Sequence, residues 1–216
     1  VQDYGFGFIE EGSFTFEGGI GNKKPRLFGL KNGGLLNRMG LNCISSEEAA
    51  RRLEHAQNPY SFAVSIAKTH NPKIIGDKAI EDIVNSYKLL RHLGIYTAIN
   101  ISCPNTAEGK TFEDELLALE ELLSEIISVG KNRPIVIKVS PLLSRKKLEG
   151  VVDACEDVVD GYEAVNTLKT ECRNLGSGGL SGPELFNLSL TTINNLRDMT
   201  FKPILGVGGI STEKEA

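Results

Sequence analysis

The stretch 99–106 reads INISCPNT, and it places reactive and hydrogen-bonding side chains directly after an apolar run. Two amides, a hydroxyl and a thiol occur within the six residues 100–105. A thiol can act as a base near neutral pH when its surroundings lower its pKa, and an amide offers both a donor and an acceptor. The stretch raises the question of what chemistry these side chains serve, and a buried structural cysteine is the plain interpretation of Cys103.

The remaining cysteines and the histidines show no pattern that suggests chemistry. No two cysteines form a CxxC pair, and no histidine lies near a cysteine at metal-ligand spacing. We therefore expect no metal site, no disulfide framework and a reducing, cytosolic setting. The residues interpreted as ordinary packing, helix or loop positions are Cys43, Cys155, Cys172, His55, His70 and His92.

Short apolar runs rich in β-branched and aromatic residues recur along the chain, with helical patterns between them. The predicted strands are 6–9, 62–66, 97–101, 135–139, 162–165 and 203–207. The predicted helices are 47–55, 79–93, 111–129, 144–159 and 189–198. Short, nearly continuous apolar strands are typical of a parallel sheet covered by helices, so the alternation indicates an α/β fold.

Polar residues gather where the predicted strands end, as in the run 100–105. Active sites of (β/α)8 barrels lie at this carboxyl face, and open doubly wound sheets also bind ligands there. Their spread over six successive strands favours the (β/α)8 TIM barrel. Six strands cannot close a barrel of eight, so we expect one βα unit before Val1 and one after Ala216. Residues 1–216 are interpreted as a single barrel domain that is incomplete at both ends.

One connection between the predicted strands is unusual. Residues 13–43 look non-helical and contain several glycines, with a short apolar piece at 27–30 between turns. This pattern predicts a β-hairpin excursion over the mouth of the barrel.

The composition argues against several classes of function. The net charge is −4, so the chain has no basic footprint for nucleic acid. No apolar run approaches the ~20 residues of a membrane span, and the first residues carry no signal-peptide pattern. Hydrophobic residues make up 40% of the chain, which suits a globular domain with a substantial core.

Eight short motifs follow one another over nearly the whole chain. They are FIEEGS, KPRLFGL, LLNRMGLN, INISCPNT, VIKVSP, VNT, GGLSG and GVGGI. In this order they resemble the dihydroorotate dehydrogenase family, although GVGGI alone occurs in many phosphate-binding barrels. The resemblance implies an FMN-dependent (β/α)8 barrel that oxidises (S)-dihydroorotate to orotate in de novo pyrimidine biosynthesis.

The resemblance assigns roles around the substrate. It implies that Cys103 takes a proton from C5 while C6 passes a hydride to the flavin. Amide side chains match the alternating N–H and C=O edge of a pyrimidine, although an asparagine alone also fits a turn or a cap. Residues 106–114 are a candidate lid. The implied substrate-binding residues are Asn37, Asn100, Asn105, Asn166 and Thr167.

The resemblance also assigns residues to FMN. Lys138 interrupts an apolar strand, where a lysine is costly without a negative partner. In the family this lysine contacts the flavin ring, where its charge can stabilise the reduced anion; a lysine that snorkels out of the strand end is the alternative. Glycines allow backbone N–H groups to approach the phosphate. The implied FMN-binding residues are Gly12, Ser13, Ser65, Asn100, Lys138, Val165, Gly182, Gly208 and Gly209.

The motifs point to two subclasses. KPRLFGL and NRMGLN resemble the membrane-associated, quinone-reducing class, whereas Cys103 resembles the soluble classes, which use fumarate or an NAD-linked partner. Because the body motifs are more extensive than one substitution, a quinone is the expected acceptor. Ser65 and Val165 also depart from the asparagine and threonine frequent in relatives. The expected location is cytoplasmic or peripheral on the inner, cytoplasmic membrane, with membrane contact through segments absent from this chain.

Other interpretations stay open. They are a fumarate- or NAD-linked dihydroorotate dehydrogenase, another FMN barrel reductase of pyrimidines such as uracil or dihydrouridine, and an inactive fragment or binding module. Comparing orotate with uracil binding separates the first two kinds of enzyme. A bound flavin separates an enzyme from an inactive fragment.

Overall fold

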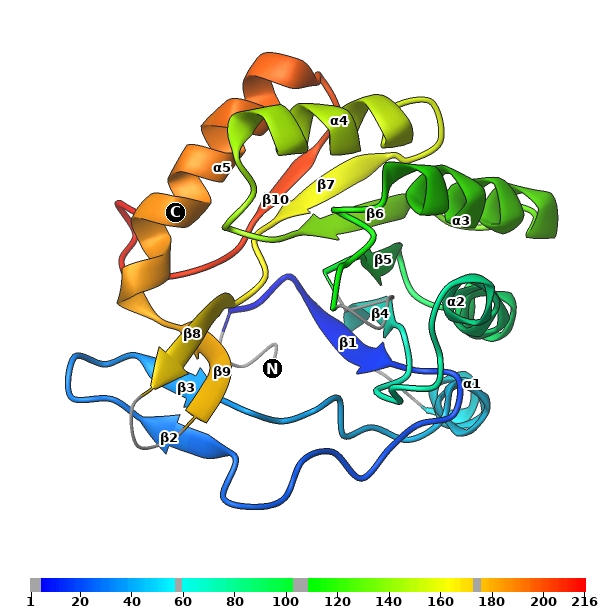
Figure 1. The fold of residues 1–216 in the computed structure, drawn as a ribbon, viewed down its shortest axis with the longest axis horizontal. Coiled ribbons are helices and arrows are strands. Elements are labelled where there is room, and N and C mark those ends of the chain that lie inside the picture. The colour runs from blue at the N-terminus through cyan, green and yellow to red at the C-terminus, as the bar shows by residue number, and fades with distance from the viewer. Residues whose placement is uncertain (1–4, 57–59, 103–108, 173–175) are drawn as a thin grey trace.

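The structure is a computed structural model that describes residues 5–56, 60–102, 109–172 and 176–216. Within these ranges six strands form one sheet in the order β1-β4-β5-β6-β7-β10 (Figure 1). They are β1 (Phe8–Phe14), β4 (Ser61–Ala67), β5 (Thr97–Asn100), β6 (Ile135–Val139), β7 (Gly161–Ala164) and β10 (Ile204–Gly206). Every neighbouring pair is parallel, which confirms the predicted α/β fold.

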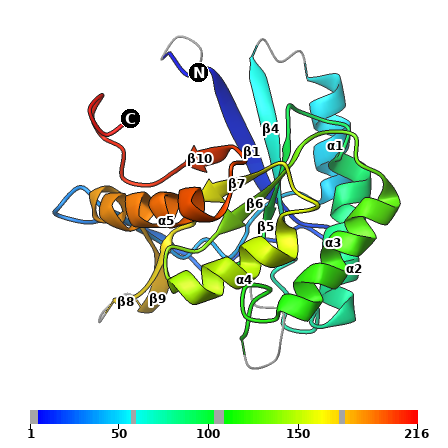
Figure 2. The ribbon, with the colours of Figure 1, turned by 90° about the horizontal axis from the view of Figure 1, so that it is seen from above.

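Five helices in the described part of the chain lie on the outside of the curved sheet (Figures 1 and 2). Helix α2 shows why they pack there, because it buries Ile80, Ile83, Val84 and Tyr87 along one face at helical spacing. No helix among the described residues is long and apolar enough to cross a membrane. The helices are α1 (Ser46–His55), α2 (Asp77–Leu90), α3 (Leu116–Val129), α4 (Arg145–Cys155) and α5 (Phe186–Met199).

The sheet is strongly curled, as a barrel requires. Strands β1 and β6 are separated by β4 and β5, which in a flat sheet would put them about 14 Å apart, or three spacings of ~4.8 Å. Yet Lys138 Nζ on β6 lies 3.3 Å from Glu10 Oε1 on β1. These two side chains therefore meet across the inner face of the curled sheet.

A second, antiparallel sheet lies beside the first in the order β2-β3-β9-β8 (Figure 1). The pair β2 and β3 confirms the hairpin that the sequence predicts within 13–43. Its pairing with β8 and β9 was not predicted, because the glycine-rich stretch 176–182 lacks the apolar run of a buried strand. The strands are β2 (Leu27–Gly29), β3 (Leu35–Asn37), β8 (Leu168–Cys172) and β9 (Gly176–Ser181).

Some predicted element boundaries differ from the structure. The helix predicted over 111–129 begins only at Leu116. Before it, the N–H and hydroxyl of Thr111 both bond to Asp114 Oδ2, each at 3.2 Å, and this local bonding forms a turn in place of a first helical turn. The strand predicted over 6–9 continues to Phe14, which carries β1 into the polar region at its carboxyl end.

Helix α3 offers a matched test of this packing. Leu122 is fully buried, whereas Leu117 is 82% exposed. We expect Leu122→Ala to lower the free energy of unfolding by about 2–4 kcal/mol, because it leaves a cavity in the core. Leu117→Ala, the control, changes it by less than about 0.5 kcal/mol. Denaturant unfolding of the intact protein measures both, and equal losses would contradict the described orientation of α3.

Candidate functional site

The carboxyl ends of the parallel strands open onto a cavity of about 630 Å³, called here the site cavity. Asn100 on β5 pairs in register with Lys138 on β6, so the parallel arrangement itself brings these two residues together. Cys103 and Asn105 lie outside the described residues. The predicted residues that line the cavity are Gly12, Ser13, Asn37, Asn100, Lys138, Asn166 and Thr167.

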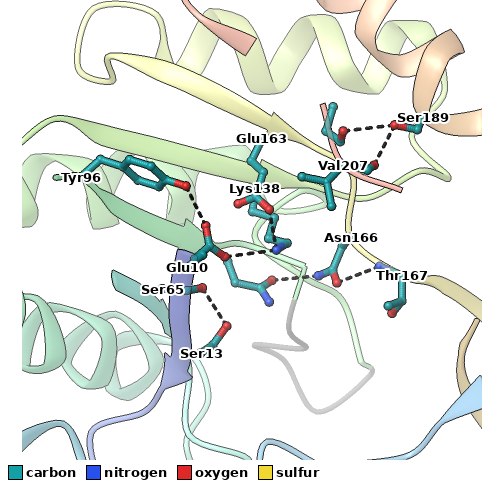
Figure 3. Close-up of polar contacts among 12 residues, drawn as sticks. Glu10, Ser13, Ser65, Tyr96, Lys138, Glu163, Asn166, Thr167, Ser189 and Val207 are labelled. Carbon is teal, nitrogen blue, oxygen red and sulfur yellow. Dashed lines mark hydrogen bonds and ion pairs between the residues drawn. The ribbon is translucent and has the colours of Figure 1, made fainter. Parts of the chain in front are cut away.

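Two of the predicted asparagines form a connected chain of hydrogen bonds. Asn166 Nδ2 donates to Asn100 Oδ1 at 3.2 Å, and the backbone N–H of Ser102 donates to the same oxygen at 3.1 Å. The backbone N–H of Thr167 donates to Asn166 Oδ1 at 2.8 Å. The oxygen end of the Asn100 amide is therefore fixed by two hydrogen bonds. Figure 3 shows how Asn166 and Thr167 lie beside it.

The remaining predicted polar residues are held by the neighbouring strands. The hydroxyls of Ser13 and Ser65 are 2.8 Å apart, so β1 and β4 meet through them at the cavity edge. Gly12 is required here, because its φ is 124° and a Cβ would lie 2.4 Å from the Ser65 carbonyl oxygen. Asn37 Nδ2 donates to the Gly179 carbonyl at 3.1 Å, which ties the second sheet to the site.

Lys138 lies between two carboxylates. Its Nζ is 2.6 Å from Glu163 Oε1 on β7 and 3.3 Å from Glu10 Oε1 on β1 (Figure 3). The hydroxyl of Tyr96 donates to Glu10 Oε2 at 3.2 Å. These four residues are called the lysine cluster below. The predicted need of Lys138 for a negative partner is met twice.

Burial and charge oppose each other in the lysine cluster. The side chain of Glu163 is 4% exposed, and burial raises its pKa to about 7 although Lys138 pulls it down. Burial alone would lower the pKa of Lys138, but the two carboxylates outweigh it and raise that pKa. Sequence reasoning missed Glu163. The usable signal was that each of two successive apolar strands contains one charged residue, Lys138 and Glu163, and these two residues pair in register.

Val165 does not line the site cavity. Its residue is 2% exposed, and its backbone N–H donates to the Val207 carbonyl at 2.9 Å. The hydroxyl of Ser189 on α5 donates to the carbonyls of Ala164 and Val207, which fixes β7 against the chain after β10 (Figure 3). The structure therefore places Val165 in the core, although the sequence assigns it to the FMN-binding residues.

The three other predicted glycines meet at the start of α5, apart from the asparagines. A Cβ on Gly209 would lie 2.5 Å from the Phe186 backbone nitrogen and 2.9 Å from the Gly182 carbonyl oxygen. Gly182, Gly208 and Gly209 have φ values of 116°, 118° and 75°, which side chains rarely adopt. We call this group the glycine cradle. A short 3₁₀ turn (η2, Pro183–Leu185) leads from it into α5, and a helix N-terminus of this kind suits an anion.

A buried carboxyl group supports the chain just before Cys103. Glu113 Oε1 accepts the Ser102 hydroxyl at 2.9 Å and the Ser140 N–H at 2.7 Å. Burial raises the pKa of Glu113 to about 7, while the two hydrogen bonds act in the opposite direction. Sequence reasoning missed this role because it placed Glu113 inside a helix. The available signal in the sequence was the large apolar side chain of the neighbouring Phe112, which the structure shows to be fully buried.

Glu113 should make stability depend on pH. Its folded pKa lies above the usual glutamate value of 4.5, so between these values the folded protein holds a proton that the unfolded chain releases. Stability therefore falls as pH rises through this window. We expect wild type to lose about 2 kcal/mol more than Glu113→Gln between pH 5 and pH 8. Denaturant unfolding measures this, with the exposed Glu121→Gln as control, and equal slopes for all three proteins would contradict it.

Comparisons with known proteins identify relatives of this chain. Dihydroorotate dehydrogenase (quinone) of Haloarcula marismortui is 34% identical over 224 aligned residues, covering 100% of this chain and 63% of the relative. The protein of the same name from Thermus thermophilus is 35% identical, over 96% of this chain and 62% of the relative. The chain thus spans about three fifths of the length of these relatives.

A crystal structure of DHODH from Eimeria tenella in complex with ferulenol superposes with a TM-score of 0.84 at 25% identity, covering 98% of this chain and 65% of that one. The curled sheet is accordingly part of a (β/α)8 TIM barrel, as the sequence predicts. The family model described as dihydroorotate dehydrogenase matches residues 1–216. The chain therefore belongs to the dihydroorotate dehydrogenase family.

Proposed function

We propose that the intact protein oxidises (S)-dihydroorotate to orotate, with FMN as its cofactor and a quinone as the final electron acceptor. One observation carries the proposal: Asn37, Asn100, Asn166 and Thr167 line the same cavity as Lys138, at the carboxyl ends of the strands. The names of the relatives, which specify a quinone, support the acceptor. A quinone acceptor favours a peripheral membrane location.

The amide side chains suit a flat pyrimidine with a carboxylate. Asn100 and Asn166 are linked at 3.2 Å, so their amide groups present a fixed set of donors and acceptors to one ligand. Asn37 approaches from β3 and is itself held by the Gly179 carbonyl. We assign substrate binding to these three residues together with Asn105 and Thr167. Their preorganisation lowers the entropy cost of orienting the substrate.

Cys103 is the proposed base that removes the proton from C5. The residue before it is anchored twice, because the Ser102 N–H bonds to Asn100 and its hydroxyl bonds to Glu113. This anchoring fixes the residue that directly precedes Cys103 in the sequence. Cys155 is unsuited to this role, since burial raises the pKa of its thiol to about 12.

The residues present fit FMN at two places. The glycine cradle has no room for a Cβ at Gly209, and its backbone at the start of α5 suits the FMN phosphate. Lys138 supplies a buried positive charge in the same barrel interior. When bound, FMN accepts the hydride that leaves C6 of the substrate. Gly12, Ser13, Ser65 and Asn100 are the other residues that we assign to the flavin side of the site, whereas the buried Val165 side chain is left out.

An anaerobic reaction tests the proposal as a whole. Dihydroorotate is added to the purified intact protein without oxygen, and the flavin absorbance is followed. We expect rapid bleaching, then recovery on adding a quinone but not on adding fumarate or NAD. A yellow protein that does not bleach would have a different substrate, and a colourless protein would contradict the flavoenzyme assignment. Recovery with fumarate or NAD alone would replace the proposed acceptor.

The role of Cys103 has its own test. We expect Cys103→Ala to lower the rate of flavin reduction by at least about 100-fold, because general base catalysis contributes on that order, while FMN binding is retained. Cys155→Ala is the matched control, since it removes a thiol from the core rather than from the site. Stopped-flow absorbance measures both. A Cys103→Ala protein that reduces its flavin at the normal rate would show that another group is the base.

The glycine cradle can be tested by adding one methyl group. We expect Gly209→Ala to weaken FMN binding by about 100-fold, because the methyl group meets the Phe186 nitrogen and the residue has a positive φ. Gly76→Ala is the control, since Gly76 also has a positive φ but nothing lies within 4 Å of the place that its added methyl group would occupy. Fluorescence titration of the apoprotein with FMN compares the two. Equal affinities would exclude the cradle as the phosphate site.

A further inference from the structure

The lysine cluster contains two acidic side chains that face one basic side chain. Lys138 supplies one ammonium group, and it faces two carboxylates, from Glu163 and Glu10. The contact to Glu163 is the shorter one, at 2.6 Å against 3.3 Å. Glu163 is also the more buried, with 4% of its side chain exposed against 20% for Glu10. Glu163 is therefore the closer and less screened counter-charge of this lysine.

One oxygen of Glu163 lacks a partner in the part of the chain that the structure describes. Among the described residues, Glu163 Oε2 is buried and has no hydrogen-bond partner. A buried carboxylate with one free oxygen is costly when ionised, and its close ion pair offsets only part of that cost. A side chain that served packing alone would be more stable as an apolar residue at this position in β7. The cost points to a role that needs the charge.

We propose that Glu163 is a positioning residue. It fixes the Lys138 ammonium and weakens the attraction that this positive charge exerts on a negatively charged flavin. This inference rests on the proposed function, because it requires FMN to bind beside Lys138. Glu163 contacts Lys138 from β7, while Glu10 does so from β1, so the ammonium is held from two sides (Figure 3). An offset of this kind weakens the preference of the site for the more negative, reduced flavin.

The offset should depend on pH. Burial holds the pKa of Glu163 far above the usual range of a glutamate, so it gains its charge as pH rises toward neutrality and beyond. The groups that face it are Lys138 from β6, Glu10 from β1 and Tyr96, whose pKa is also raised by burial, so that its hydroxyl stays protonated throughout. At low pH Glu163 is neutral and Lys138 acts on the flavin more fully. At high pH Glu163 is ionised and opposes it.

The experiment compares the affinities of the intact protein for reduced and oxidised FMN at pH 6 and pH 8. We expect Glu163→Gln to raise the ratio of reduced to oxidised affinity by about tenfold at pH 8 and by no more than about twofold at pH 6, as removal of one nearby charge predicts. The exposed Glu121→Gln is the control, since it removes a carboxylate outside the lysine cluster. It should keep the wild-type affinity ratio at both pH values.

The outcomes distinguish a failure of the positioning role of Glu163 from a failure of the proposed function. A Glu163→Gln protein that binds FMN with an unchanged affinity ratio at both pH values would overturn the positioning role. Wild-type protein that binds no FMN would instead overturn the proposed function. Should Glu163→Gln fail to fold, Glu163→Met removes the same charge at similar volume and gives the same comparison. A purely structural role for Glu163 would change stability without changing the affinity ratio or its pH dependence.

Discussion

The ammonium of Lys138 joins β6 to β1 across the inner face of the sheet, and the site depends on the curl that allows this contact. A parallel sheet that stayed flat would leave the polar ends of its strands in a row. Curling turns that row into a ring, so that side chains from β1, β5 and β6 line one cavity. The apolar outer face packs against the helices, and this packing maintains the curl.

Much of the fold was predictable because its strands are short, apolar and separated by amphipathic helices. The register was not predicted from the sequence, and it is the structure that places Asn100 beside Lys138. The second sheet was only half predictable. Its β8 and β9 strands contain little apolar sequence, and they are defined by pairing with β3 rather than by burial of their own side chains. Such strands leave a weak local signal in a single sequence.

The candidate site shows the same division. Its asparagines were predictable because they occur in short motifs in a fixed order, and the structure gathers the described ones around one cavity. Glu113 and Glu163 were missed, because a glutamate in a sequence looks solvent-exposed until its partners are known. Their partners, Ser140 and Lys138, come from other segments of the chain. Long-range pairing of this kind is set by the tertiary fold and not by the local pattern.

The two missed glutamates explain how the site is kept in place. Glu113 binds the hydroxyl of Ser102, the residue before Cys103. Glu163 forms an ion pair with Lys138, the positively charged residue of the site. Each carboxyl group is buried at a cost, and burial raises the pKa of each to about 7. A barrel interior selected for stability alone would replace them with apolar residues. Their presence indicates that the interior of this barrel is arranged around charge, and that stability is given up to hold that charge in place.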